Sequence, residues 1–286
     1  MTRCRVHILR AGACSHPEVM TRRDGSLKPA VFPALAALII HPDEGAILFD
    51  TGYDPAFFEA TRTFPEILYR WMTPVDLPPG ETVAEQLPGF GVRPEDVTAV
   101  IVSHFHGDHV AGLKRFPNAR ILCARAGLDQ VRKPGRFARV RQGVLADLAP
   151  ADIDARAVFF EDRPRLPLGP DLSPFEAGAD LLGDGSLLAV QLPGHCPGHW
   201  GLVVRQDDGR TRFLIADAAW SSGAVRHNVP PPRLTTALLG QTGPWRDTLT
   251  ALHRLWDRNP DLLLTPSHCG EVPTETRPAE TRHVGG

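Results

Sequence analysis

The sequence lacks the hydrophobic segments that export a protein or anchor it in a membrane. The apolar stretch at residues 34–40, ALAALII, is far shorter than the ~18 consecutive apolar residues that a transmembrane helix needs. The N-terminal residues, MTRCRVHILRAG, contain no apolar core of the about 7–15 residues that marks a secretory signal. We therefore predict a cytoplasmic protein that does not associate with membranes.

The sequence also has few cysteines and a small net charge. The five cysteines are odd in number and far apart, which excludes a disulfide framework and indicates reduced thiols, as in the cytoplasm. A net charge of −2 gives no general attraction to nucleic acids. The basic run at residues 132–141 is expected to be solvated surface. A nucleic-acid partner is therefore not predicted, while the sequence leaves a homodimer possible.

Short apolar runs between turn residues predict most of the strands. Residues 33–50 predict a hairpin around Asp-Glu-Gly, and residues 201–217 predict another around Asp-Asp-Gly. Residues 97–104 predict a buried strand. Residues 55–72 predict short helices broken near Pro65. An amphipathic helix is predicted before Pro260, with an apolar face formed by Leu249, Leu252, Leu255 and Trp256.

These elements predict an α/β (α+β) fold in which two β-sheets pack face to face and helices cover the outside. We expect one domain over residues 1–286. Within it, residues 55–80 are expected to form a lid-like segment. Residues 134–180 are rich in proline, arginine and aspartate without a clear period, and they are expected to form an insertion.

The segment SHFHGDH, residues 103–109, holds three histidines and an aspartate directly after a predicted strand. His104 and His106 alternate, so an extended chain would point both imidazoles the same way. Gly107 permits a turn that would direct Asp108 and His109 toward a second position. Imidazole and carboxylate ligands together suit Zn²⁺, and they also suit Fe or Mn. The motif therefore predicts a metal site.

Further candidate ligands follow later predicted strands. His195 lies in PGHCPGH, where the prolines and glycines argue against a helix and favour a loop that presents one ligand and one supporting histidine, His199. Asp217 follows the apolar run FLIA, and His268 follows LLLTPS. Taken alone, Asp217 is equally well a helix N-cap, and His268 is equally well a surface histidine at a strand end. Their common position at strand ends favours one shared site.

Together, ILFDTG, HFHGDH, PGHCPGH, ADAAW and PSHC resemble, in this order, the metallo-β-lactamase superfamily of hydrolases. The resemblance extends from Asp50 to His268 and implies an αββα sandwich. It implies two divalent metal ions, most simply Zn²⁺. It assigns the first metal to His104, His106 and His195, the second to Asp108, His109 and His268, and a bridging position to Asp217. It further implies that Asp50 and His199 support these ligands.

The implied chemistry is hydrolysis. Two metal ions about 3.5–4 Å apart would bridge a water and generate hydroxide, which would attack a carbonyl or phosphorus atom. Asp108 would orient this nucleophile or pass a proton to the leaving group, so Asp108 and Asp217 are the candidate catalytic residues. The seven predicted ligands include no cysteine, which argues against a purely structural zinc site.

Within the superfamily the layout is most similar to the N-acyl-homoserine lactonase-like branch, which implies a small lactone or ester substrate. That branch often carries a tyrosine three residues after the bridging aspartate, where this sequence has Trp220. An indole N–H can donate a hydrogen bond but cannot act as an acid. We expect Phe105, Trp200 and Trp220 to line the substrate pocket, because each lies near a predicted ligand.

Two alternatives remain open. One is a thioester or phosphoester hydrolase of the same fold, similar to glyoxalase II or to phosphotriesterase-like members. The other is a non-catalytic protein in which metals and pocket only hold a ligand. The complete ligand set favours an enzyme, and hydrolysis assays separate the three possibilities.

Overall fold

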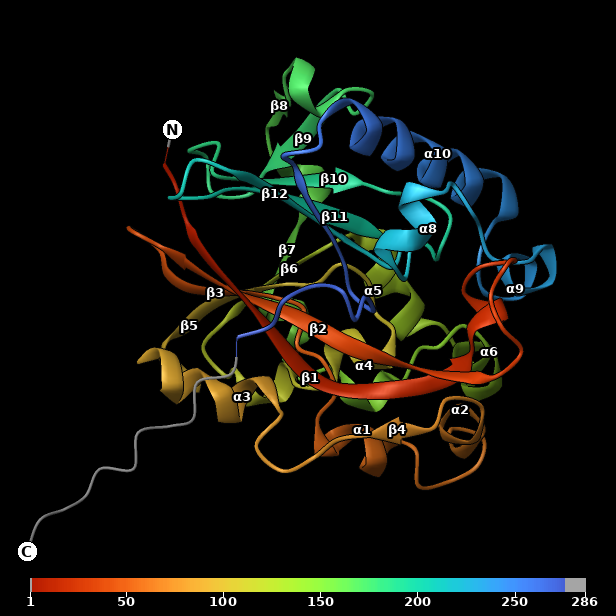
Figure 1. The fold of residues 1–286 in the computed structure, drawn as a ribbon. Helices are drawn as coiled ribbons and strands as arrows, with labels where there is room; N and C mark the ends of the chain where they lie inside the picture. The colour runs from red at the N-terminus through yellow and green to blue at the C-terminus, as the bar shows by residue number, and fades with distance from the viewer. Residues whose placement is uncertain (1, 276–286) are drawn as a thin grey trace, which may run out of the picture.

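The computed structural model describes residues 2–275, and its two β-sheets pack face to face with helices on both outer sides (Figure 1). Within these residues the first sheet contains, in spatial order, β4 (Val75–Asp76), β1 (Arg5–Pro17), β2 (Pro29–His41), β3 (Gly45–Phe49), β5 (Val97–Ile101), β6 (Arg120–Cys123) and β7 (Ala157–Phe159). The second contains β13 (Leu263–Pro266), β12 (Thr211–Ala216), β11 (Trp200–Arg205), β10 (Leu187–Gln191), β9 (Ala177–Asp180) and β8 (Arg165–Pro167). The expected αββα sandwich is confirmed.

Short helices and one long helix cover the sheets. Near the first sheet lie α1 (Pro55–Ala60), α2 (Ile67–Met72), α3 (Val83–Gln86), α4 (Gly107–Val110), α5 (Arg125–Arg132), α6 (Arg136–Arg141) and α7 (Ile153–Arg156). Near the second lie α8 (Ser222–Arg226), α9 (Arg233–Leu239) and α10 (Thr242–Arg258). In Figure 1, α10 lies above the second sheet, and α1 to α3 lie below the first.

Alternating side chains in the strands produce the layers. In β2, Leu38 points into the apolar cluster under the helices of the first sheet, and the next residue, Ile39, points into the cluster between the two sheets. This period of two explains why β2 is apolar on both faces, since both are buried. A third cluster lies between the second sheet and α10, to which Leu249, Leu252 and Leu255 contribute. Trp256, predicted on the same face, is only partly buried.

Most predicted elements are present, and β1 is longer than its apolar run suggests. The hairpin of β2 and β3 closes with His41 opposite Gly45, and β11 pairs with β12 as the second predicted hairpin. The VHIL run predicts only the first part of β1, which continues through the polar segment to Pro17. A shift of pairing between Arg10 and Ala13 accommodates Gly12, whose φ of 79° suits glycine.

Residues 134–180, expected to be an insertion, supply edge strands to both sheets. β7 pairs with β6 in the first sheet, whereas β8 and β9 form the edge of the second. These strands have 3, 3 and 4 residues. Runs this short show no measurable period in the sequence, and their pairing partners determine their conformation.

One hydrogen-bonded chain links the turns of the two sheets. His41 Nδ1 accepts hydrogen bonds from the amides of Asp43 (3.2 Å) and Glu44 (3.0 Å), so its Nε2 carries the proton that is donated to Asp184 (3.0 Å). Asp184 also accepts a 2.6 Å hydrogen bond from the Ser186 hydroxyl. Burial raises the pKa of Asp184, but the hydrogen bonds from Ser186 and His41 outweigh it and lower the pKa to about 2.

This link predicts acid-dependent stability. Because the pKa of Asp184 is lower in the folded chain, its stabilising effect is present above the unfolded value near 4 and is lost as the pH falls toward about 2. Since Asp184 is partly exposed, we expect Asp184→Asn to lower the free energy of unfolding by about 1–2 kcal/mol at pH 7. The difference from the wild type should shrink between pH 4 and pH 2. Urea unfolding of both proteins over this range measures it, and a difference independent of pH would contradict the assignment.

Candidate metal centre

The predicted ligands follow strands whose ends meet at one edge of the sandwich. Residues 103–109 follow β5 and lead into α4, Asp217 follows β12, and His268 follows β13. His195 lies in the loop between β10 and β11. Parallel pairing of β3 with β5 and of β12 with β13 brings the corresponding strand ends together. All seven predicted ligands lie in one buried cluster, namely His104, His106, Asp108, His109, His195, Asp217 and His268.

Asp217 occupies the middle of the cluster. Its Oδ1 lies 3.3 Å from Nε2 of His109 and 3.3 Å from Nε2 of His268. Its Oδ2 lies 3.3 Å from Nε2 of His195. One carboxylate therefore faces histidines from both predicted metal sites, which is the geometry that a bridging ligand requires.

The ligand atoms fall into two overlapping groups. His104, His106 and His195, together with the Cys196 thiol, have ligand atoms within 4.8 Å of one another, and so do Asp108, His109 and His268. Asp217 forms a further group with His104 and His109, which connects the two. The structure thus brings together the residues that the resemblance assigns to each metal. Cys196 lies close enough to be an additional ligand at the first.

The buried polar atoms without hydrogen-bond partners indicate whether the cluster fits metal ions. Nε2 of His104, His109 and His268 is buried in each case and has no hydrogen-bond partner. Oδ1 of Asp217 is likewise unpaired, because its contacts with histidine lack hydrogen-bond geometry. Buried polar atoms are almost always paired, so a concentration of unpaired nitrogen and oxygen atoms indicates a position for bound cations. The residues fit divalent metal ions.

Asp50 orients the metal-binding loop from beneath. Its Oδ2 accepts hydrogen bonds from Nδ1 of His109 (2.7 Å) and from the Ser103 hydroxyl (2.7 Å), and its Oδ1 accepts one from the Ser103 amide (2.8 Å). The hydrogen bond from Nδ1 of His109 to Asp50 leaves Nε2 of the same ring facing the cluster. His268 is fixed in the same way, since its Nδ1 donates to the Pro33 carbonyl (2.7 Å). Such outer hydrogen bonds set the tautomer and direction of a histidine ligand.

We expect Asp50→Asn to lower kcat/KM by roughly 10- to 100-fold, the range found when such outer partners are removed. The amide keeps the size of Asp50 but cannot accept all three hydrogen bonds, so His109 loses its fixed orientation. Steady-state kinetics with metal analysis measure the effect. Asp43→Asn, a change of the same type in the exposed turn between β2 and β3, is the control. Unchanged kinetics in Asp50→Asn would contradict the assigned role.

Two unusual backbone conformations adjoin the ligands. Asp50 has a φ of 59° and Ala216 a φ of 46°, both in the left-handed region that non-glycine residues rarely adopt. Ala216 immediately precedes Asp217, and the pairing of β12 with β13 shifts at this point. Such strain costs about 1–3 kcal/mol and concentrates at functional sites. Here the left-handed residues turn the chain at the strand ends where Asp50 and Asp217 begin their loops.

The PGHCPGH loop is held tightly between α10 and α5. A Cβ on Gly194 would collide with the backbone of Trp245, and one on Gly198 would collide with that of Gly127. His199 Nδ1 donates to the Leu192 carbonyl (2.9 Å), and its Nε2 accepts from the Asp217 amide (3.1 Å). Both ring nitrogens are therefore engaged. His199 supports Asp217, as the sequence predicts, and is not placed to bind metal.

Burial and neighbouring charge set the protonation of the cluster. Burial lowers the pKa of His104 and of His195 well below the usual value, which favours the neutral imidazole that binds metal. Burial also acts to lower the pKa of His109, but Asp108, Asp50 and Asp217 raise it well above the usual value. For Asp108, burial raises the pKa, yet His109 and His268 outweigh it and lower the pKa to about 2. Asp108 is therefore ionised at neutral pH.

The cluster opens into a largely apolar cavity of about 130 Å³. Asp108, His195 and Asp217 line its floor, and Trp220 forms part of its wall. The Trp220 ring lies against His268, with ring centroids 4.3 Å apart. The structure therefore places Trp220 at the site, as expected.

Of the other two aromatic residues expected in the pocket, Trp200 lies in the core, whereas Phe105 lines a second cavity beside the histidines. Trp200 is buried between the sheets against Phe160 and lines neither of the two cavities next to the histidines. Its position at the start of β11 directs the side chain into the core, so proximity in sequence to His199 is misleading. Phe105 packs on Gly127 within the core of the first sheet and reaches only the second cavity.

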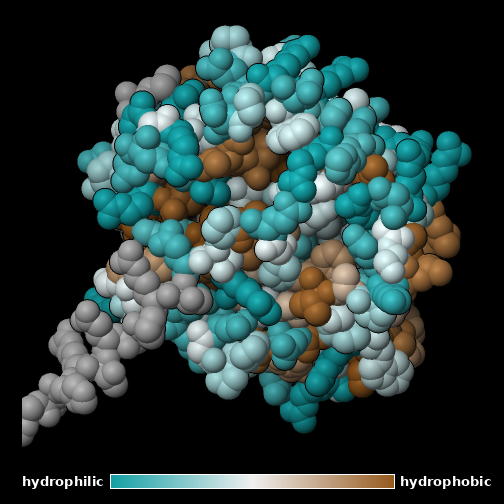
Figure 2. Space-filling model, in the orientation of Figure 1, coloured by the Kyte–Doolittle hydropathy of each residue, from teal (hydrophilic) through white to brown (hydrophobic). Residues whose placement is uncertain are grey.

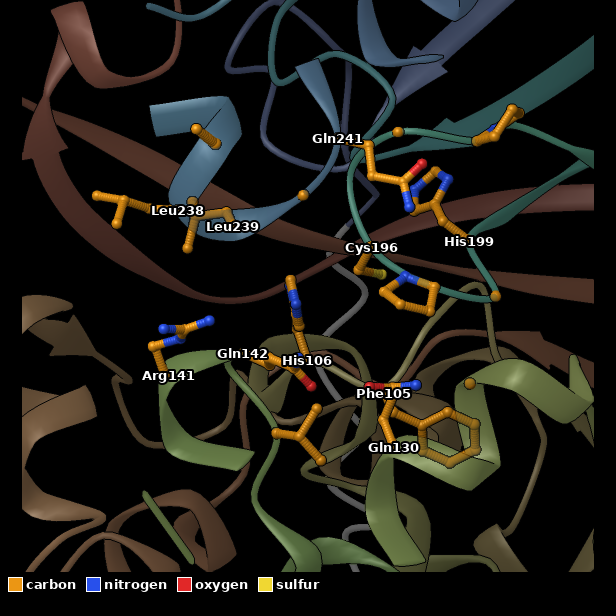
Figure 3. Close-up of a pocket in the computed structure, with 18 of the residues that line it drawn as sticks. Phe105, His106, Gln130, Arg141, Gln142, Cys196, His199, Leu238, Leu239 and Gln241 are labelled. Carbon is orange, nitrogen blue, oxygen red and sulfur yellow. The ribbon is translucent and has the colours of Figure 1, made fainter. Parts of the chain in front are cut away.

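A second cavity of about 380 Å³ adjoins the first and shares His106 and Leu239 with it. Figure 3 shows this cavity between two sets of side chains. On one side are Phe105, His106, Gln130, Arg141 and Gln142, and on the other are Cys196, His199, Leu238, Leu239 and Gln241. Glutamine amides and Arg141 make this wall polar, unlike the apolar wall around Trp220.

Sequence reasoning missed four residues at the site. Ser103 was detectable, because it directly precedes the first histidine and connects it to Asp50. Tyr53 and Tyr69 both line the metal cavity. Trp245 packs edge-on against His195 at a centroid distance of 4.9 Å. Only the tertiary structure brings these three to the cluster.

Comparison with known proteins agrees with the fold. The family model described as "Metallo-beta-lactamase superfamily" matches residues 30–268. This chain belongs to the metallo-β-lactamase superfamily. It is 31% identical over 220 residues to the metallo-hydrolase mfmC of Annulohypoxylon moriforme, an alignment that covers 74% of this chain and 55% of that protein.

Lactonases are among the similar proteins. The chain is 32% identical over 137 residues to the N-acyl homoserine lactonase AttM of Rhizobium radiobacter, which covers 48% of this chain and 47% of that protein. The chain thus spans about half the length of these two curated relatives. A solved N-acyl homoserine lactone hydrolase, with the product N-hexanoyl-L-homoserine at its catalytic metal centre, superposes with a TM-score of 0.71 at 18% identity. That superposition covers 95% of both chains.

Among residues 2–275, no helix of this superfamily member has the length and apolar character needed to cross a membrane.

Proposed function

We propose that this chain is a dinuclear metal-dependent hydrolase that opens a lactone or cleaves a related ester. The observation that carries this proposal is the buried cluster of five histidines and two aspartates, which contains unpaired polar atoms and adjoins an apolar cavity. In this proposal His104, His106 and His195 hold one cation and Asp108, His109 and His268 hold the other. Asp217, which lies within 3.3 Å of histidines from both sets, bridges them.

The chain's own residues position the reaction and move its proton. Two bound divalent cations would supply an activated water and polarise the carbonyl oxygen of the substrate. Asp108 is ionised and lines the cavity, so it accepts the proton released as water adds to the carbonyl carbon. When the carbon–oxygen bond to the leaving group breaks, the same carboxyl group delivers that proton to the leaving oxygen. The products are an alcohol and a carboxylic acid, which releases its remaining proton to solvent at neutral pH, and the two groups are joined in one molecule when the substrate is a lactone.

The cavity favours an uncharged, partly apolar substrate. Met20, Met72 and Trp220 line it, and they carry no charge to bind a polyanion. Apolar side chains also gather outside the cavity. Figure 2 shows them at the edge of the molecule over α9 and α2, where Leu234, Leu238 and Met72 are exposed. We infer that this surface receives an acyl or aromatic part of the substrate, and that residues 55–80 act as the lid-like wall through Tyr69 and Met72.

A substrate panel on metal-loaded protein tests the proposal. The panel contains acyl-homoserine lactones, simple aliphatic lactones, an aryl ester, a thioester and a phosphotriester, each with the zinc-, iron- and manganese-loaded enzyme. We expect metal-dependent hydrolysis of the lactones and aryl ester. Preferred turnover of the thioester or phosphotriester would replace the proposed substrate class. Two bound metals without hydrolysis of any member would indicate a ligand-binding protein.

The remaining expectations concern the setting of the enzyme. Zinc is proposed for both positions because imidazole and carboxylate are its ordinary ligands. A cytoplasmic location is consistent with five free cysteines. A homodimer and the absence of a nucleic-acid partner stay predictions. Light scattering gives the mass of the protein in solution, and a comparison before and after nuclease treatment shows whether nucleic acid contributes to that mass.

A further inference from the structure

Tyr53 is fixed at the edge of the metal cavity by its backbone and ring. It follows β3 in the DTGY segment, and its amide donates a 3.0 Å hydrogen bond to the Ala11 carbonyl. Its ring packs edge-on against Phe57, with centroids 5.1 Å apart. Close contact with Gly12 closes the other side, where an added Cβ would lie 3.3 Å from the Tyr53 Cβ. Only 1% of the residue is exposed, so its hydroxyl has a defined position.

The hydroxyl of Tyr53 has no hydrogen-bond partner within the described chain. A buried O–H group is normally paired, because it loses its hydrogen bonds to water on folding. The neighbouring polar group is the thiol of Cys14. Burial raises the pKa of this thiol to about 11, so it stays neutral and is a weak acceptor. The phenol therefore has only a weak acceptor beside it in the free protein.

Tyr53 lines the same cavity as Asp108 and Asp217, and its hydroxyl is shielded from solvent beside this site. Burial, and next the charge of Asp108, raise the pKa of Tyr53 well above its usual value, so the phenol keeps its proton. Two other donors in this wall are already paired within the protein. Trp245 Nε1 donates to the Ala218 carbonyl (3.0 Å), and the Thr21 hydroxyl donates to the Glu18 carbonyl (2.9 Å).

We propose that the Tyr53 hydroxyl donates a hydrogen bond to an oxygen of the bound substrate and thereby stabilises the negative charge that develops there during hydrolysis. This inference rests on the proposed function. A fixed, neutral donor in a dry site is effective at this task, because it needs no rearrangement as the charge forms. An unpaired hydroxyl in the free protein is what such a role requires, since the substrate supplies the acceptor.

Tyr53→Phe tests the proposal by removing only the hydroxyl. We expect kcat/KM for the preferred lactone or ester to fall roughly 100-fold, as when one donor to a developing oxyanion is removed. The bound metal should be unchanged. The midpoint of thermal unfolding should stay close to that of the wild type, because only the weak contact with the Cys14 thiol is lost.

Thr61→Val is the matched control, because it removes a buried hydroxyl that does have a partner. The Thr61 hydroxyl donates to the Phe57 carbonyl (2.7 Å) and does not line the metal cavity. This variant should show the opposite result, with a lower unfolding midpoint and an unchanged kcat/KM. Wild-type kinetics in Tyr53→Phe would overturn the proposal. A loss of activity that accompanies a loss of metal or of thermal stability would also overturn it, because the role would then be structural.

Binding measurements separate this inference from the proposed function. The ring-opened hydroxy acid is titrated into zinc-loaded wild type and Tyr53→Phe by calorimetry. Weaker binding by at least fivefold in the variant supports the hydrogen bond, and equal affinity overturns it. If the wild type hydrolyses no member of the substrate panel, the proposed function fails, and the affinity comparison still decides whether Tyr53 contacts the ligand.

Discussion

Asp217→Asn is expected to reduce turnover by roughly a thousandfold, which corresponds to the several kcal/mol of transition-state stabilisation that a metal centre supplies. Asparagine has nearly the same shape, but it lacks the negative charge and one of the two carboxylate oxygens. Asp217 is 2% exposed and lies within 3.3 Å of His109, His195 and His268, so water cannot replace the missing oxygen. Bound metal should therefore fall below two ions per chain, as measured by elemental analysis beside steady-state kinetics.

Asp208→Asn is the control for this substitution. Asp208 lies in the turn between β11 and β12, is paired with Arg210, and is 39% exposed at its side chain. It should keep both the metal content and the activity of the wild type. If Asp217→Asn retains two metal ions and more than a tenth of the wild-type turnover, Asp217 is not the bridging ligand.

Removal of the metal ions is expected to abolish hydrolysis and to lower the unfolding midpoint. A ligand present at 100 times its dissociation constant stabilises the folded state by about 2.7 kcal/mol, which corresponds to a shift of roughly 5 °C or more in a domain of this size. We expect the chain to remain folded, because the apolar cluster between the two sheets is separate from the ligands. Calorimetry before and after dialysis against a chelator measures the shift, and added Zn²⁺ should restore both midpoint and activity.

The same experiment on Asp217→Asn gives the internal comparison. Because this variant should bind less metal, the chelator should change its unfolding midpoint by less than that of the wild type. Full ester hydrolysis by metal-free wild-type protein would contradict the role of the cations. An unchanged midpoint on chelation, with two ions measured beforehand, would show that the metals bind without stabilising the fold.

The cluster of candidate metal ligands was predictable because much of its pattern is local. His104, His106, Asp108 and His109 are adjacent in the chain, and the two-residue period of a strand end already indicates which side chains share a direction. Asp217 and His268 were individually ambiguous, and only their common position after apolar runs favoured a shared site. The layered fold was predictable for the same reason. The alternation of apolar and polar side chains, together with the turn residues, indicates which face of each strand is buried.

The pairing of strands that are distant in the chain was harder to predict from the sequence. β7, β8 and β9 are too short to show a period, and they are strands because β6 and β10 offer them edges. The two tryptophans near predicted ligands illustrate the same limit. Trp200 and Trp220 are both neighbours of site residues in sequence, yet Trp200 faces the core and Trp220 faces His268. Which face a side chain takes depends on the sheet register, which the partner strand determines.

The sequence by itself determined the family, the fold and the identity of the candidate ligands, because motif spacing and hydrophobic alternation are properties of neighbouring residues. The tertiary structure decided how those ligands are held and what surrounds them. It placed Asp50 under His109, turned the chain at Ala216 through a left-handed conformation, and brought Tyr53 to the cavity with its hydroxyl unpaired. Each of these features depends on contacts between segments far apart in the chain, so no local pattern could have shown them.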